Sequence, residues 1–196
     1  EHHAGNHPVV IIGTGLAGVN LAKEFRKQNK DTALILITSD DGRLYSKPML
    51  STGFTKNTDA NALAQQDAGT LARSLDASVW TFTKVTAIDT AKQELKIDDG
   101  ITVKYSKLVL TPGADVIRAP LEGDGLDLVY SINDLLDYDD FRKAIANLKA
   151  KKIVIIGAGL IGCEFANDLS NGGFEVESID PMGWCLPTLL PEAAGR

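Results

Sequence analysis

Two short apolar runs near the start of the chain predict buried strands. Residues 9–12 read Val-Val-Ile-Ile and break directly into Gly13, and residues 33–37 form a second such run. Continuous β-branched and aliphatic runs are typical of strands covered on both faces in a parallel sheet. Between them, residues 17–27 predict an amphipathic helix. Its apolar stripe comprises Leu21, Ala22 and Phe25, and its polar face Lys23, Glu24, Arg26 and Lys27. The pattern predicts a βαβ unit with parallel strands.

The middle of the chain changes to shorter, alternating segments. Residues 38–62 are polar and too long for a simple connection, which is typical of a functional loop. Alternation then predicts an antiparallel insert with strands at 78–82, 84–88, 94–97 and 102–105 and a turn at 98–100. Residues 107–110 return as an apolar strand that ends at Thr111-Pro112-Gly113.

The opening pattern recurs near the other end of the chain. A helix is predicted over 134–151, followed by a strand at 152–156, Gly157, a helix over 161–170 and a strand at 175–179. This is an internal duplication of the βαβ unit. Because a doubly wound domain ordinarily needs three or more further strands, we expect the second unit to be incomplete.

Composition narrows the class of protein. Of the 196 residues, 44% are hydrophobic and 23% charged, as in soluble globular proteins. A net charge of -6 argues against a nucleic-acid binder, and no apolar run is long enough to predict membrane insertion. Cys163 and Cys185 lack metal-ligand or redox spacing, which favours a reduced, cytoplasmic setting; a disulfide between them stays open. The histidines cluster in the leader, and hydrolase and P-loop motifs are missing from the sequence, so metal, hydrolase and phosphoryl-transfer sites are not expected.

Each βαβ unit carries a GxGxxG fingerprint between its first strand and its helix. The first is formed by Gly13, Thr14, Gly15, Leu16, Ala17 and Gly18, and the second by Gly157, Ala158, Gly159, Leu160, Ile161 and Gly162. The first glycine permits the tight turn, the second lets a pyrophosphate approach the backbone, and the third allows close helix packing. The helix N-terminus then offers N–H groups to the diphosphate. Two dinucleotide sites are therefore predicted.

An acidic residue follows the second strand of each unit. Asp40 is placed to accept the ribose hydroxyls of the first dinucleotide, and Asp180 those of the second. The Asp180 carboxylate would repel the 2′-phosphate of NADP, and no arginine lies near it in the sequence to bind that phosphate. The second site is therefore predicted to prefer NADH.

Two segments of the chain closely resemble bacterial rubredoxin-NAD reductases, which are glutathione-reductase-like pyridine nucleotide oxidoreductases. They are the loop Arg43-Leu44-Tyr45-Ser46-Lys47-Pro48-Met49-Leu50-Ser51-Thr52-Gly53-Phe54 and the run from Gly157 to Ser170. The resemblance covers nearly the whole chain after Pro8. It implies an α/β fold class: a Rossmann-like FAD-binding domain with an antiparallel β insert over 9–115, then the opening βαβ of a second, NAD-binding Rossmann-like domain over 151–196. Residues 1–8 are expected to be a flexible leader and 116–150 a connection with a helix.

The same resemblance implies roles for particular residues. Lys47 would lie near the flavin N5 and pair with Glu164, although each position alone also fits a solvated lysine or a surface glutamate. The fingerprint residues Thr14, Gly15, Leu16 and Ala17 would hold the FAD diphosphate. The remaining implied FAD contacts are Ser39, Asp40, the Val85 backbone, Thr111 and Gly113; Val85 fits an ordinary strand position equally well.

The implied activity is electron transfer from NADH through FAD to rubredoxin, which would supply an oxygenase such as an alkane hydroxylase. Ser46-Lys47-Pro48 contains no cysteine, so thiol relay chemistry at that position is excluded. Cys163 is expected to be a small core residue. Two alternatives remain: an NADH-dependent ferredoxin reductase of a dioxygenase or P450 system, and an inactive FAD-binding fragment. The oligomeric state is not indicated.

Overall fold

The computed structural model describes residues 7–196, which form two compact units. Unit 1 contains the described residues up to Tyr45 together with Ala64–Val116, and unit 2 contains Ser46–Leu63 and Ile117–Arg196. The predicted leader, apart from His7 and Pro8, lies outside the described residues. The predicted domain boundaries at residues 115 and 150 stay predictions.

A four-stranded parallel sheet organises unit 1, with strand order β3-β2-β1-β7. Its strands are β1 (Val9–Ile12), β2 (Leu34–Ile37), β3 (Ser78–Trp80) and β7 (Lys107–Leu110). β1 pairs with β2 on one side and with β7 on the other, both in parallel. The carboxyl ends of β1, β2 and β7 therefore meet at one edge of the sheet, where the first fingerprint begins.

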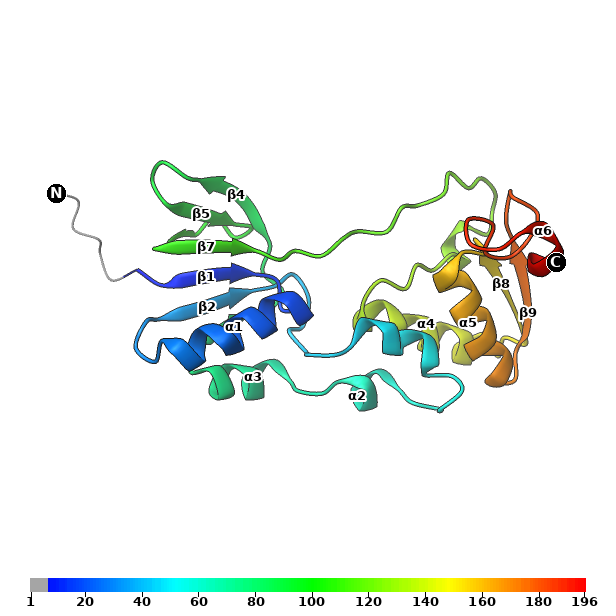
Figure 1. The fold of residues 1–196 in the computed structure, drawn as a ribbon, viewed down its shortest axis with the longest axis horizontal. Coiled ribbons are helices and arrows are strands. Elements are labelled where there is room, and N and C mark those ends of the chain that lie inside the picture. The colour runs from blue at the N-terminus through cyan, green and yellow to red at the C-terminus, as the bar shows by residue number, and fades with distance from the viewer. Residues whose placement is uncertain (1–6) are drawn as a thin grey trace. The chain divides into compact units, whose positions relative to one another are not determined.

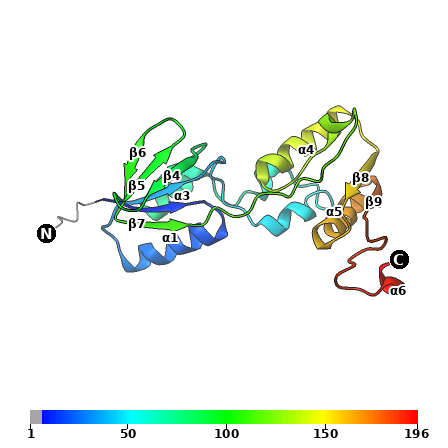
Figure 2. The same ribbon diagram turned by 90° about the horizontal axis from the view of Figure 1, so that it is seen from above.

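Different layers cover the two faces of this sheet (Figures 1 and 2). Helices α1 (Leu16–Gln28) and α3 (Ala68–Leu75) pack on the face that carries Val9, Ile11 and Leu36. The opposite face, with Val10 and Ile37, packs against an antiparallel sheet. The strands of that sheet are β4 (Val85–Asp89), β5 (Glu94–Ile97) and β6 (Thr102–Lys104). Burial of alternate residues on both faces explains the continuous apolar run of β1.

The structure confirms the predicted βαβ unit and corrects three details of unit 1. Leu21, predicted on the apolar stripe of α1, is 40% exposed. The segment predicted as the first strand of the antiparallel insert, 78–82, instead forms β3, which pairs in parallel with β2. Arg26, predicted on the polar face of α1, is only 8% exposed. Its guanidinium donates to backbone carbonyls of Leu75, Asn29, Lys30, Thr32 and Asp76. A buried guanidinium is tolerated because these carbonyls at two helix ends satisfy its donors.

The predicted polar loop over 38–62 contains two short helical segments. These are the 3-10 helix η1 (Lys47–Thr52) and the helix α2 (Ala60–Leu63), and both belong to unit 2. The other elements of unit 2 are η2 (Leu126–Leu128), α4 (Leu135–Asn147), β8 (Lys152–Ile156), α5 (Leu160–Asn171), β9 (Glu175–Ile179) and α6 (Glu192–Gly195). α4 ends four residues before the end of the helix predicted over 134–151, and Asp134 caps its first turn.

The second βαβ unit forms as predicted, with β8 and β9 paired in parallel and α5 between them in sequence. The face of β8 and β9 that carries Val154, Ile156 and Ile179 is exposed. Phe54 forms edge contacts with Tyr138, Phe141 and Phe174, so an aromatic cluster joins the end of η1 to α4 and to the start of β9. No helix within residues 7–196 is both long and apolar enough to span a bilayer.

Candidate dinucleotide sites

The first fingerprint turns sharply from β1 into α1. Glycine stands at its three positions for different physical reasons. Gly13 has φ +105°, and a Cβ built on it would overlap the carbonyl oxygen of Thr111. A Cβ on Gly18 would overlap the carbonyl oxygen of Gly13. By contrast, Gly15 has φ -67°, and no described atom lies within 4 Å of a Cβ built there. The fold therefore requires glycine at 13 and 18 but leaves open space at 15.

The second fingerprint repeats this division. Gly157 has φ +106°, and a Cβ on Gly162 would overlap the carbonyl oxygen of Gly157. The space around Gly159, the N-cap of α5, is again empty of described atoms within 4 Å. At both helix N-termini, the middle glycine borders open space, and the first backbone N–H groups of the helix have no partner within the helix. This is the arrangement that accepts a diphosphate.

Apolar side chains at the start of both helices are exposed. Leu16 is 44% exposed, Leu160 is 59% exposed and Ile161 is 70% exposed. Ala17 is exposed as well. These residues of the first turn follow the open glycine positions, and their contact with a cofactor stays a prediction.

Asp40 lies beside the first fingerprint, immediately after β2. Its Oδ1 accepts from Thr38 Oγ1 at 2.7 Å and from the Gly42 N–H at 2.8 Å, and Thr14 Oγ1 lies 3.5 Å from the same oxygen. These contacts hold the carboxylate at the carboxyl edge of the sheet and leave its other oxygen, Oδ2, for a ligand. The structure thus brings Thr14 and Asp40 together, and their contact with FAD stays a prediction.

The other predicted FAD contacts surround the same edge. Ser39 is exposed beside Asp40, and Gly113 is exposed after β7. Thr111 Oγ1 donates to the Ile12 carbonyl at 2.7 Å, which ties β7 to the fingerprint turn. Val85 begins β4, is partly buried and packs against the buried cluster that includes Val10 and Ile37. Cofactor contact by these residues stays a prediction.

Asp180 has the corresponding position in unit 2. Its Oδ2 accepts from the Ala158 N–H at 2.8 Å, inside the second fingerprint, and its Oδ1 accepts from the Met182 N–H at 2.8 Å. The first of these backbone hydrogen bonds, and then the second, hold the pKa of Asp180 below its ordinary value. The group is therefore a carboxylate at neutral pH.

Lys47 and Glu164 lie on contacting elements, η1 and α5, and both are exposed. Lys47 Nζ donates to Asn133 Oδ1 at 2.7 Å, whereas Glu164 Oε2 accepts from Ser51 Oγ at 2.9 Å. Among the ion pairs of the described residues, none joins Lys47 to Glu164. Their role at a flavin stays a prediction, and Asn133 and Ser51 are their partners in this structure.

Sequence reasoning missed Asp168, which holds the Lys47 segment in place. Asp168 is 1% exposed, and its carboxylate accepts from the Phe54 N–H at 2.9 Å and the Thr55 N–H at 2.7 Å. From α4, Tyr138 donates to the Thr58 carbonyl at 2.8 Å, and the Arg142 guanidinium lies over the Phe54 ring. Burial is the main cause that raises the pKa of Tyr138. The sequence shows Asp168 four residues after Glu164 in a predicted amphipathic helix, and this pattern does not indicate that the aspartate is buried.

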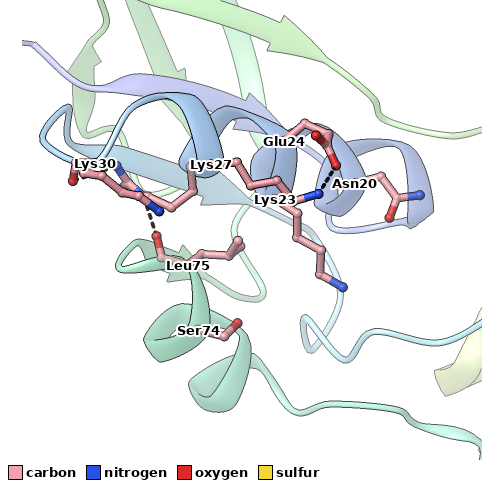
Figure 3. Close-up of a pocket in the computed structure, with 8 residues that line it drawn as sticks. Asn20, Lys23, Glu24, Lys27, Lys30, Ser74 and Leu75 are labelled. Atoms are coloured by element: carbon pink, nitrogen blue, oxygen red, sulfur yellow. Dashed lines mark hydrogen bonds and ion pairs between the residues drawn. The ribbon is translucent and has the colours of Figure 1, made fainter.

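A depression lies along the later turns of α1 (Figure 3). It is lined by Asn20, Lys23, Glu24, Arg26, Lys27, Lys30, Ser74 and Leu75. Lys27 pairs with Glu24 at its rim, and Arg26 is already satisfied by carbonyls. The depression contains none of the predicted site residues. Within residues 7–196 we also find no group of His, Cys, Asp and Glu side chains that could hold a metal ion.

Comparison with known proteins agrees with the two fingerprints. The family described as pyridine nucleotide-disulphide oxidoreductase matches residues 7–196. The chain is 54% identical to a rubredoxin-NAD(+) reductase of Alcanivorax borkumensis, over 97% of the chain and 49% of the relative. It is 42% identical to the corresponding protein of Acinetobacter baylyi, over 95% of the chain and 49% of the relative. The chain thus spans about half the length of these relatives.

Solved structures show the same fold. The NADH:rubredoxin oxidoreductase of Clostridium acetobutylicum superposes with a TM-score of 0.82 at 24% identity, over 96% of this chain and 48% of that one. At this identity the likeness concerns the fold alone. Because the family match covers both fingerprints and every described residue, the chain belongs to the pyridine nucleotide-disulphide oxidoreductase family.

Proposed function

We propose that the protein to which this chain belongs is a flavoprotein that transfers electrons from NADH through FAD to rubredoxin. The observation that carries the proposal is the pair of open glycines, Gly15 and Gly159, each at a helix N-terminus with a carboxylate fixed beside it. Neither glycine is required by the fold, but both leave room for a diphosphate. The acceptor is inferred from the relatives that are 54% and 42% identical, which are named rubredoxin-NAD(+) reductases.

The residues present fit both cofactors. The α1 N-terminus and Gly15 would hold the FAD diphosphate, and Asp40 Oδ2 would accept an adenosine ribose hydroxyl. The α5 N-terminus, Gly159 and Asp180 would hold the corresponding groups of NADH. When bound, FAD supplies the chemistry that converts a two-electron hydride donor into a source of single electrons.

Lys47 and Glu164 are proposed to act together at the flavin. The Lys47 cation would stabilise negative charge near the flavin N5, and Glu164 would balance that charge. Their placement on contacting elements supports the pairing, which requires Lys47 to exchange Asn133 for Glu164. We also propose a cytoplasmic location, which is consistent with Cys163 and Cys185 being free thiols here. The electrons would then supply an oxygenase such as an alkane hydroxylase.

The acceptor is tested with the full-length protein. We expect the purified protein to carry flavin absorbance and to reduce rubredoxin with a higher kcat/KM than ferredoxin, with NADH as donor. Steady-state rates with both purified carriers measure this. A higher kcat/KM with ferredoxin would contradict the proposed acceptor while leaving the two cofactor sites intact, and a protein that binds no flavin after reconstitution would contradict the function itself.

The choice of nicotinamide cofactor gives a second test. We expect kcat/KM for NADH to exceed that for NADPH by at least about tenfold, or ~1.4 kcal/mol, because the Asp180 carboxylate repels a 2′-phosphate. Asp180→Asn removes the charge but keeps an acceptor for the Ala158 N–H, so the ratio should fall in this variant. A preference of the unaltered protein for NADPH, or an unchanged ratio in Asp180→Asn, would refute the role of Asp180.

A further inference from the structure

Cys163 and Cys185 are 22 positions apart in sequence, yet the fold places them together next to the second fingerprint. Cys163 lies in the first turn of α5, and its Sγ donates to the Ala158 carbonyl at 3.3 Å. The Leu186 N–H donates to the same carbonyl at 2.7 Å. One oxygen therefore fixes both the Cys163 thiol and the backbone next to Cys185.

Because the Cys163 thiol and the Leu186 N–H share one acceptor, Cys185 lies close to Cys163. Cys185 is exposed, whereas Cys163 is half-buried. Burial, and then the neighbouring Cys185, raise the pKa of the Cys163 thiol, so Cys163 is mostly protonated at neutral pH. Cys185 is therefore the more accessible of the two thiols to a small oxidant.

The segment that carries Cys185 begins at the proposed NADH site. It follows directly from Asp180, whose carboxylate holds the Ala158 N–H. Besides the Leu186 contact, the Cys185 N–H donates to the Gly195 carbonyl at 2.9 Å. Residues 181–186 consequently connect the proposed ribose-binding carboxylate to the first turn of α5, and the N–H groups of Met182, Gly183, Cys185 and Leu186 all donate hydrogen bonds.

We propose that Cys163 and Cys185 form a reversible redox pair whose disulfide tethers residues 181–186 to α5 and hinders NADH binding. The Cys185 thiolate attacks a low-molecular-weight disulfide such as glutathione disulfide and releases one glutathione thiolate. The Cys163 thiolate then attacks the Cys185 sulfur and releases the second. Two protein thiols are oxidised, one glutathione disulfide is reduced to two thiols, and the two protons pass to the released thiolates. The effect on NADH rests on the proposed function, but the bond itself does not.

The covalent step is tested on the full-length protein incubated with glutathione disulfide and with dithiothreitol. After glutathione disulfide, we expect peptide mapping to recover one cross-linked peptide containing Cys163 and Cys185. A thiol-specific reagent should then detect neither thiol. Dithiothreitol should restore both. Cys163→Ser and Cys185→Ser should each abolish the cross-link, and Cys163→Ser should retain glutathione on Cys185. A wild-type protein that keeps glutathione on Cys185, or that forms only intermolecular dimers, would overturn the pair.

The effect on NADH has a separate readout. The KM for NADH should be several-fold higher in the oxidised protein than in the reduced protein, with the difference absent in Cys185→Ser. A cross-linked protein with an unchanged KM would overturn the hindrance. A protein without NADH activity in either state would refute the proposed function instead, because the cross-link is measured independently.

Discussion

Replacing Gly15 with alanine is expected to abolish tight FAD binding and leave unit 1 folded. A methyl group at this position would meet no described atom within 4 Å, but it would occupy the space proposed for the diphosphate. As an N-cap, alanine in place of glycine should cost at most about 1 kcal/mol of folding stability. The FAD dissociation constant should rise about hundredfold or more, equivalent to ~2.8 kcal/mol. Flavin titration of the apoprotein, followed by fluorescence, measures the change.

Gly18→Ala is the matched control. It should lower the folding stability of the apoprotein, whereas Gly15→Ala should mainly lower FAD affinity. Glycine to alanine inside a helix usually stabilises by about 1 kcal/mol, but here the new methyl group would overlap the Gly13 carbonyl oxygen. We expect a net loss of about 2 kcal/mol in the apoprotein, seen as a lower midpoint in denaturant. If Gly15→Ala destabilised the apoprotein as much as Gly18→Ala, or bound FAD normally, the assignment of the open glycine to the ligand would be wrong.

Asp168→Ala should produce a loss of stability that is large for a single substitution, about 3 kcal/mol in the free energy of unfolding. The change leaves the N–H groups of Phe54 and Thr55 without the carboxylate that accepts both, and Asp168 is only 1% exposed. Hydrogen bonds to a charged group contribute about 1.5–3 kcal/mol each. Because the released segment also carries Lys47, the absorption spectrum of bound flavin should shift as well. Chemical denaturation and flavin spectroscopy measure the two effects.

Asp139→Ala provides the comparison within the same unit. Asp139 pairs with Lys143 one turn further along α4, and the exposed lysine limits the strength of such a pair. We expect a change of no more than about 0.5 kcal/mol. Equal losses in the two variants, or an Asp168→Ala protein that unfolds like the unaltered one, would show that Asp168 does not hold the Lys47 segment.

Much of the local structure could be predicted because it follows short-range rules. A glycine with positive φ ends β1 and β8, and a carboxylate follows β2 and β9. Since parallel strands of a βαβ unit share a carboxyl edge, these residues had to meet. Asp40 with Thr14, and Asp180 with Ala158, are both observed.

The partners of several side chains could not be predicted. Arg26 is buried because carbonyls at the ends of α1 and α3 converge on it, and no helical periodicity contains that information. Lys47 contacts Asn133, 86 positions away, and the strand at 78–80 pairs in parallel with β2, a partner that alternation within the segment does not encode.

The sequence by itself determined the two βαβ units, their glycine turns and the carboxylate beside each, because these depend on residues close together in the chain. Only the tertiary structure decided which middle glycines border open space, that Asp168 holds the Lys47 segment, and that Cys163 meets Cys185. Those features depend on contacts between segments distant in sequence, which hydrophobic periodicity and motif spacing do not encode.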